Sequence, residues 1–316
     1  MTSRATGGAQ AHGSAAGVAY ALSAFGLWGL FPLYFKAVAA VPAPEVLAHR
    51  IVWSVVFVGA LLAVFGQWRA VGDALRDGRM RWRLLVSSLL ISANWLIFIW
   101  AIANARALEA SLGYFITPLV SVLLGRLVLG ERLAPVQWLA IALAAAGVTW
   151  MLVGVGVVPW VALGLAASFG SYGLVRKVAD VPAMPALFVE TLIVMPPALA
   201  WLAWLALEGT GRFGAGGLGF DLLLAAAGLV TATPLILFGQ ATRRLRLASV
   251  GLFQYIVPTM QMLLAVFAFG EPFTPDHAIT FACIWVGLAL YSGSAWGGRA
   301  GRRAPAGGTT ATEERA

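Results

Sequence analysis

Ten long apolar segments constrain this chain more than any other feature of its sequence. Each is close to the ~20 mostly apolar residues that an α-helix needs to cross the hydrocarbon core of a bilayer. They cover approximately residues 17–38, 46–66, 83–103, 110–130, 135–153, 158–177, 186–207, 220–240, 247–269 and 277–296. The short alternating segments of a β-barrel are not found, and lipid forces each backbone to satisfy its own polar groups. The sequence therefore predicts an all-α integral membrane protein with ten transmembrane helices.

Composition agrees with lipid as the main solvent. Of the 316 residues, 60% are hydrophobic and only 11% are charged, which is too little charge to cover a soluble domain of this size. The formal net charge of +8 comes mostly from short arginine clusters between apolar segments, a pattern typical of a cytoplasmic membrane face. Nucleic acid is therefore not an expected partner, whereas the lipid bilayer is.

The distribution of basic residues predicts the orientation. With the N-terminus placed inside and the loops assigned alternately, 17 of the 21 Lys and Arg residues fall on the cytoplasmic side. Losing one helix would scramble every later loop, so this partition favours ten helices with both termini cytoplasmic.

Both ends of the chain are expected to be irregular. Residues 1–15 are rich in Gly, Ala, Ser and Thr, and residues 297–316 mix Arg, Gly, Thr and Glu. A cleaved signal peptide is the alternative for the start, but the apolar stretch that follows is longer than a signal core. The lone Cys283 excludes an intrachain disulfide and is expected to be a buried apolar side chain.

Two stretches of the chain repeat each other. The motif Ala-Ser-x-Gly-x-Phe occurs at 110–115 and again at 248–253, a separation of 138 residues. Pro118 and the Gly-Glu pair at 130–131 recur 140 residues later, as Pro258 and the pair at 270–271.

A weaker match relates the first and sixth segments, so each half contains five helices. The sequence thus predicts a first repeat over 16–153 and a second over 154–296. Because five is odd, the second half enters the membrane with opposite polarity, as in alternating-access carriers with a midplane substrate site. Chance recurrence of Gly, Pro and Ala in apolar helices is the competing explanation.

Several longer motifs are specific enough to indicate a family. They are Leu-Trp-Gly-Leu-Phe-Pro-Leu-Tyr-Phe-Lys at 27–36, Val-Pro-Ala-Pro-Glu-Val-Leu-Ala-His-Arg-Ile-Val-Trp-Ser at 41–54, Glu-Ala-Ser-Leu-Gly-Tyr-Phe-Ile-Thr-Pro-Leu-Val at 109–120, Tyr-Gly-Leu-Val-Arg-Lys at 172–177 and Phe-Gln-Tyr-Ile-Val-Pro-Thr at 253–259. Together they resemble the RarD-type proteins of the EamA branch of the drug/metabolite transporter superfamily. The resemblance implies ten helices in a 5+5 inverted repeat and a place in the bacterial inner membrane. It implies transport of a small solute but no defined cargo. Thr117 stands where the family pattern has Asn, so selectivity at that position is in doubt.

Charged side chains inside the spans are the first candidates for transport, because each costs roughly 2.5–3.5 kcal/mol to insert. Glu45 and His49 are one helical turn apart and could exchange a proton near neutral pH, with Arg50 beside them. An interfacial pair that anchors the helix end is the alternative. Glu190 is expected either to act in transport or to pair with a neighbouring cation such as Arg176. Lys36 is expected either to reach the membrane surface or to neutralise an anionic cargo.

Uncharged polar and aromatic side chains are the candidates for a cavity wall, with packing between helices as the alternative. They are Trp28, Tyr34, Asn94, Tyr114, Tyr172, Gln254 and Gln261. Gln254 and Gln261 are seven residues apart, which predicts one helix face.

Pro118 and Pro258 are expected to kink their helices, for gating or as static bends. The Gly293–Gly297 step is compatible with a homodimer.

No nucleophile, metal-ligand or cofactor motif stands out, so neither an enzyme nor a metal or cofactor site is expected. A solute carrier is thus the favoured function. A channel or an intramembrane enzyme are the alternatives.

Overall fold

The computed structural model describes residues 7–130, 133–155, 158–179, 181–242, 244–245 and 253–300, and every regular element within them is a helix. In chain order these are α1 (Gly7–Gly29), α2 (Phe31–Ala37), α3 (Ala43–Phe65), α4 (Trp68–Arg76), α5 (Gly78–Ala103), α6 (Ala107–Leu129), α7 (Pro135–Val155), α8 (Trp160–Ala179), α9 (Ala183–Leu207), α10 (Leu218–Ala225), α11 (Ala227–Thr242), α13 (Ile256–Leu263), the π-helix η1 (Leu264–Ala268) and α14 (Pro275–Ala300).

Within the described residues, seven helical stretches are long and apolar enough to cross a membrane. They are 15–37, 43–65, 78–103, 107–129, 135–153, 183–207 and 218–241, and two shorter apolar stretches cover 256–268 and 275–290. The chain is therefore a multi-pass helical membrane protein, as predicted. The count of ten spans stays a prediction, because three of the expected segments fall short of this criterion.

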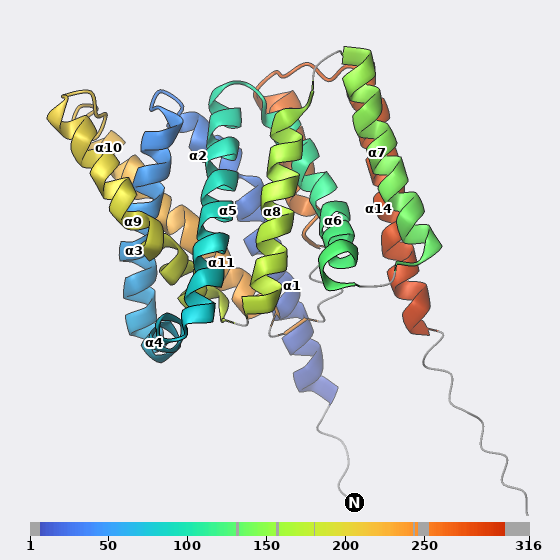
Figure 1. Ribbon diagram of the computed structural model, residues 1–316, viewed down its shortest axis with the longest axis horizontal. Coiled ribbons are helices and arrows are strands. Elements are labelled where there is room, and N and C mark those ends of the chain that lie inside the picture. The colour runs from blue at the N-terminus through green and yellow to red at the C-terminus, as the bar shows by residue number, and fades with distance from the viewer. Residues whose placement is uncertain are drawn as a thin grey trace, which may run out of the picture.

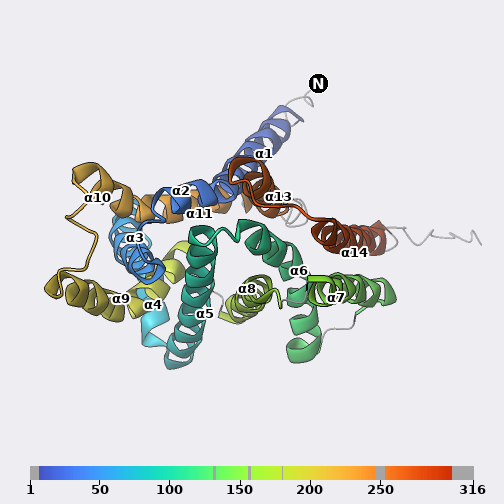
Figure 2. The same cartoon turned by 90° about the horizontal axis from the view of Figure 1, so that it is seen from above.

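Two groups of helices face each other when the molecule is viewed along the helix axes (Figure 2). One group, here the first bundle, consists of α5, α6 and α8, and α8 packs along both of the others. The second bundle consists of α1, α2, α11 and α13; α1 packs along α11 and α13 and continues into α2. The pair α3–α9 closes one side of the gap between the bundles, and α7 packs on α14 at the other side (Figure 2).

Close backbone contact holds helices together at two glycines. A Cβ on Gly113 of α6 would lie 2.7 Å from the carbonyl oxygen of Ala162 in α8. A Cβ on Gly228 of α11 would collide with the carbonyl oxygen of Trp53 in α3. Since real Cβ atoms do not approach so closely, larger residues at either position would push the helices apart.

The two prolines that were expected to kink their helices differ. Pro118 lies inside α6, where it removes one backbone hydrogen bond. Pro258 lies in the first turn of α13, where the missing N–H has no helical partner to lose. Its role as a kink stays a prediction, because most of the segment that precedes α13 lies outside the described residues. The motif copy at 248–252 lies outside the described residues.

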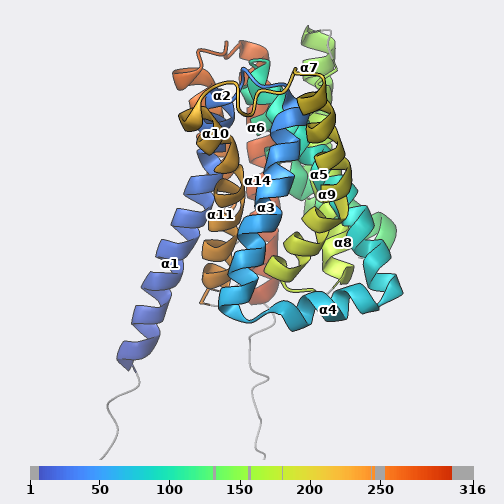
Figure 3. The same ribbon diagram turned by 90° about the vertical axis from the view of Figure 1, so that its left-hand side faces the viewer.

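The described ends of the chain, the first turn of α1 and the last of α14, lie at the same end of the molecule (Figure 1). The short helix α4 crosses that end roughly perpendicular to the long helices (Figure 3). The chain start differs from expectation, because α1 is already helical from Gly7; residues 1–6 and 301–316 lie outside the described residues. The side chains around Gly293 and Gly297 are not described either, so the homodimer stays a prediction.

Candidate functional site

Arg50 lies between the two bundles, about two helical turns below the start of α3. Its side chain is buried, with only 4% of the residue exposed. The guanidinium carbon is 4.0 Å from the ring centroid of Trp95 in α5 and 5.4 Å from that of Phe35 in α2. Its Nε donates a 3.0 Å hydrogen bond to Oγ1 of Thr231 in α11. One cation thus contacts α2, α5 and α11, which belong to both bundles.

No carboxylate forms an ion pair with Arg50 among the described residues. Aromatic faces supply part of the missing stabilisation, at about 2 kcal/mol for a desolvated contact with a ring. Taking a charge out of water costs several kcal/mol, so aromatic rings and one hydroxyl leave Arg50 incompletely compensated.

A row of aromatic rings begins beside Arg50 and runs toward the opposite end of the molecule. Phe35 is 5.8 Å from Phe98, which is 5.7 Å from Tyr114. Tyr114 is 6.0 Å from Phe169, which is 5.8 Å from Tyr172. All distances are between ring centroids, within the range of stabilising aromatic pairs. Tyr114 and Tyr172 were expected on a cavity wall, and the structure brings them together in one row.

Asn94 stands beside this row but is fully engaged in packing. Its Nδ2 donates to the carbonyl oxygen of Leu165 at 3.2 Å and to Oγ of Ser168 at 3.0 Å, both in α8. Its Oδ1 accepts a 3.1 Å hydrogen bond from the hydroxyl of Tyr114 in α6. Asn94 therefore ties the first bundle together, which is the packing alternative for this residue.

Glu190 in α9 ends the row. It is 1% exposed, and its carboxylate accepts hydrogen bonds from Oγ of Ser87 at 2.6 Å and from the hydroxyl of Tyr172 at 3.2 Å. Nε of Arg176 lies 3.8 Å from the same carboxylate, so the two form an ion pair. The expected pairing of Glu190 with a neighbouring cation is thus present in the geometry.

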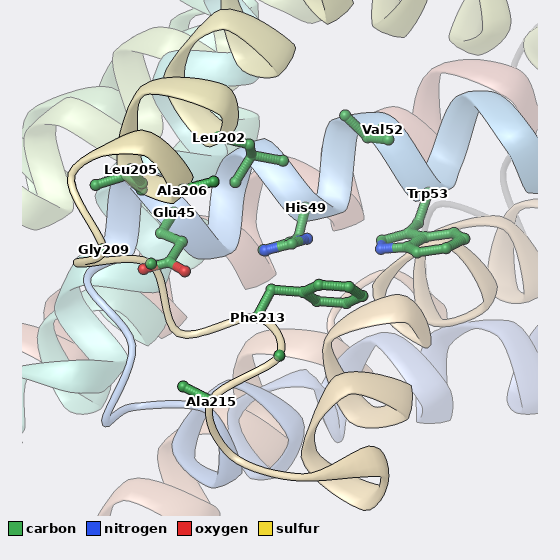
Figure 4. Close-up of a pocket in the computed structure, with 12 residues that line it drawn as sticks. Glu45, His49, Val52, Trp53, Leu202, Leu205, Ala206, Gly209, Phe213 and Ala215 are labelled. Atoms are coloured by element: carbon green, nitrogen blue, oxygen red, sulfur yellow. The ribbon is translucent and has the colours of Figure 1, made fainter.

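A cavity of about 530 Å³ opens at the upper end of α3, between α9 and the segment that leads into α10 (Figure 4). Glu45 and His49 both line it, together with the ring of Phe213, which stacks on His49 at 5.0 Å. Glu45 Oε1 accepts a 2.6 Å hydrogen bond from the backbone N–H of Arg212. His49 is 5% exposed, and its Nε2 has no hydrogen-bond partner among the described residues. The two titratable groups share a face, as predicted, without bonding to each other directly.

The same end of the molecule contains a link that sequence reasoning missed. Glu271, which follows η1, accepts 2.7 Å hydrogen bonds from the backbone N–H groups of Ala107 and Leu108 at the start of α6. A carboxylate at a helix N-terminus satisfies otherwise unpaired donors and interacts favourably with the helix dipole. The repeated Gly-Glu pair was the available signal, but its partner is 163 residues away.

Of the remaining candidates, Tyr34 touches the aromatic row, since its ring is 5.1 Å from that of Phe35, and the others lie apart from Arg50 and the row. Lys36 is exposed and rests over the ring of Phe269 at 5.6 Å, in agreement with a side chain that reaches the surface. Trp28 packs against Phe238 within the second bundle. Gln261 is buried, and its Nε2 is 3.5 Å from the carbonyl oxygen of Trp28. Gln254 is exposed in a turn ahead of α13, so the two glutamines do not share a helix face.

Tyr34 caps the second bundle, since its hydroxyl donates a 2.9 Å hydrogen bond to the carbonyl oxygen of Leu223 in α10. Across the described part of the chain, no cluster of three or more His, Cys, Asp or Glu residues could hold a metal ion.

Comparison with known proteins places this geometry in context. A sequence model described as the EamA-like transporter family matches residues 15–153 and matches again over 158–293. A Vibrio cholerae protein described as an uncharacterized transporter is 50% identical over 276 residues, which are 87% of this chain and 91% of that protein. Protein RarD of Escherichia coli is 46% identical over 275 residues, 87% of this chain and 93% of RarD.

A more distant relative is the chloramphenicol-sensitive protein RarD of Pseudomonas aeruginosa, 36% identical over 88% of this chain and 93% of its own length. A solved crystal structure shares the fold with a TM-score of 0.56 at 21% identity, covering 88% of this chain and 97% of that chain.

Proposed function

Because the chain belongs to the EamA-like transporter family, we propose that it moves its small-molecule cargo across the bacterial inner membrane by alternating access. Its RarD relatives and its apolar helices make it a bacterial multi-pass membrane transporter. The mechanism, the repeat and the orientation are the proposal, and the packing of the helices supports each of them.

Helix packing supports two inverted five-helix repeats, 16–153 and 154–296, with ten spans in all. In this arrangement α1–α2, α3, α5, α6 and α7 correspond to α8, α9, α10–α11, α13–η1 and α14. Three contacts that join the proposed repeats then have counterparts: α5–α8 matches α11–α1, α6–α8 matches α13–α1, and α5–α9 matches α11–α3. The two successive matches to one family model agree with this assignment.

The observation that carries the proposal is that α8 packs on α5 and α6, while α1 packs on α11 and α13. The first bundle takes α8 from the second repeat, and the second bundle takes α1 from the first repeat. The bodies that move are therefore the two bundles, not the two halves of the sequence. Arg50 lies where they meet.

Contacts between the bundles at the upper end favour an outward-closed state. Glu271 ties the segment after η1 to the start of α6, and Oγ of Ser111 in α6 donates a 2.8 Å hydrogen bond to the carbonyl oxygen of Pro258 in α13. Opening toward that side would break both contacts. The opposite end contains both described chain ends and the arginine-bearing helix α4, which supports its assignment as cytoplasmic (Figure 3).

Proton coupling through the outer cavity is the second part of the proposal. His49 faces Glu45 on its own helix, and Asp221 of α10 is near enough to act on it electrostatically. Arg212 approaches through its backbone. A histidine between acidic groups can gain and lose a proton near neutral pH. Transport measured against pH in Glu45→Gln and His49→Ala tests this, and a profile unchanged in both variants would refute the coupling.

Alternating access can be tested without knowing the cargo. Spin labels at Asn104→Cys and Phe273→Cys, in a Cys283→Ala background, report the distance at the upper end between the end of α5 and the segment after η1 that Glu271 links to α6, since both positions are exposed. Pulsed electron resonance on protein in lipid nanodiscs measures that distance. We expect two populations, and we expect Glu271→Gln to enlarge the longer one because it weakens the link.

A single unchanged distance in both proteins contradicts alternating access. If that result comes with a linear, non-saturating flux in vesicles, the channel alternative replaces the carrier.

A further inference from the structure

We propose that Arg50 binds the anionic group of the cargo, and that the cargo is a small carboxylate with an aromatic or apolar body. This rests on the proposed function for its meaning in transport, but binding itself can be tested separately.

The unused donors of Arg50 are the first argument. A guanidinium has five N–H donors, which match a carboxylate in a bidentate arrangement. In the described part of the chain only Nε of Arg50 forms a hydrogen bond, to Thr231. Both terminal nitrogens are therefore available to an anion at the interface of the bundles.

Two other arginines are partly buried near aromatic rings or charges, and both differ from Arg50. Arg106 lies over the rings of Trp100 and Trp160, at 5.6 and 6.0 Å, but it also pairs with Glu109 at 3.3 Å. Arg176 pairs with Glu190. Arg50 is more buried than either and has no carboxylate among the described residues. A cation that binds an anionic cargo must lack a carboxylate partner within the protein, and Arg50 meets this condition among the described residues.

The surroundings define the rest of the cargo. The rings of Phe35, Phe98 and Tyr114 extend away from the guanidinium, and each ring contacts the next one. An aromatic or aliphatic body attached to the carboxylate would lie along this row once the bundles separate, since ring faces and edges bind apolar groups. A strongly polar anion would have to leave its water for this row and is disfavoured.

Thermal stability of the purified full-length protein tests the proposal with matched acid and amide probes. The acids are benzoate, 3-phenylpropanoate and indole-3-acetate, each compared with its neutral amide at equal concentration. A ligand that binds the folded form raises the apparent melting temperature. We expect at least one acid to raise it and its amide to do so far less.

Variants of Arg50 locate the effect. Arg50→Gln should weaken the affinity for the stabilising acid about 10- to 100-fold, the range of one or two charge-assisted hydrogen bonds. Arg50→Lys retains the charge without the bidentate fork and should lose less. Arg106→Gln is the matched control, an arginine among aromatic rings that already has its own carboxylate, and it should keep the wild-type affinity.

The proposal is overturned if no acid in the panel stabilises the protein, if amides stabilise as well as acids, or if Arg50→Gln binds like the wild type. If Arg50→Gln does not fold, the ratio of the affinity for the acid to that for its amide is compared between the wild type and Arg50→Lys. An equal ratio in the two proteins overturns the proposal. Two populations in the spin-label experiment without acid binding would sink this inference alone. Acid binding through Arg50 with a single population would sink alternating access alone.

Discussion

Arg50 and Glu190 are two buried charges of opposite sign at matching places in the chain. They are 140 residues apart, and each lies seven residues after the start of its helix, α3 at Ala43 and α9 at Ala183. The two helices begin at opposite ends of the molecule (Figure 1). Glu190 has a cation and two hydroxyl donors around its carboxylate, whereas Arg50 has aromatic faces and one hydroxyl.

The partners around each charge indicate which of the two holds the helices together. A buried charge with a counterion and hydrogen bonds holds helices together, because removing either partner leaves the other uncompensated. Glu190 joins α9 to α5 through Ser87 and to α8 through Tyr172 and Arg176. Arg50 lacks such a set among the described residues, so its charge is buried at a cost, which agrees with our proposal that it binds the cargo.

The largest expected effect is loss of stability on removal of the Glu190 carboxylate. Glu190→Ala leaves Arg176 half-buried without its anion and Ser87 without its acceptor, which should cost about 3–5 kcal/mol of unfolding free energy. Denaturation in mixed micelles measures it. Adding Arg176→Gln should recover part of the loss, and a double variant no more stable than Glu190→Ala contradicts the ion pair.

Ser87→Ala should give the next largest effect. It removes a 2.6 Å hydrogen bond to an ionised group, worth about 1.5–3 kcal/mol. The neighbouring Ser88 bonds the backbone carbonyl of Glu190, so Ser88→Ala is a matched control that should cost less, about 1 kcal/mol. Equal losses in the two variants would mean that the Glu190 carboxylate adds no special stability.

Removing the indole beneath Arg50 should reduce acid binding by a smaller factor. Trp95→Leu deletes the ring at 4.0 Å, and a contact worth about 1–2 kcal/mol corresponds to a 5- to 30-fold loss of affinity. Titration of the stabilising acid against melting temperature measures this. Trp100→Leu, which removes a ring beside Arg106, serves as the control and should leave affinity unchanged.

The smallest effect is expected from neutralising Arg50 itself, when stability and not binding is measured. Arg50→Gln removes ring contacts and a hydrogen bond, but it also removes an unpaired charge whose burial is unfavourable. The two terms oppose each other, so the unfolding free energy should change by about 1 kcal/mol or less. A loss as large as that of Glu190→Ala would show that Arg50 is structural too.

The sequence predicted the helical membrane fold and the family because apolar length, basic clusters and long motifs are local properties of a chain. It also identified Arg50, Glu45, His49 and Glu190, since charges stand out in apolar segments. The sequence could not show which of these charges have an ion-pair partner on another helix. Nothing near Arg50 in the chain distinguishes it from Glu190, whose cation comes from α8.

Differences between the sequence pattern and the structure have the same origin. Pro258 matches Pro118 in sequence, but it lies in the first turn of α13 whereas Pro118 lies inside α6, because helix boundaries depend on tertiary packing. Gln254 and Gln261 fit a helical spacing, but a turn precedes Ile256 and separates them. Glu271 bonds the start of α6, a contact that no local pattern encodes.

Counterflow of the stabilising acid in proteoliposomes is the most direct test of these roles. It is compared between a variant that lacks the Arg50 charge and a double variant that lacks the Glu190 and Arg176 charges. We expect saturable counterflow in the wild type, its loss in Arg50→Gln, and its retention in the double variant Glu190→Gln with Arg176→Gln. Wild-type counterflow in Arg50→Gln, or loss in the double variant while it remains folded, would contradict the assignment of Arg50 to cargo and Glu190 to structure.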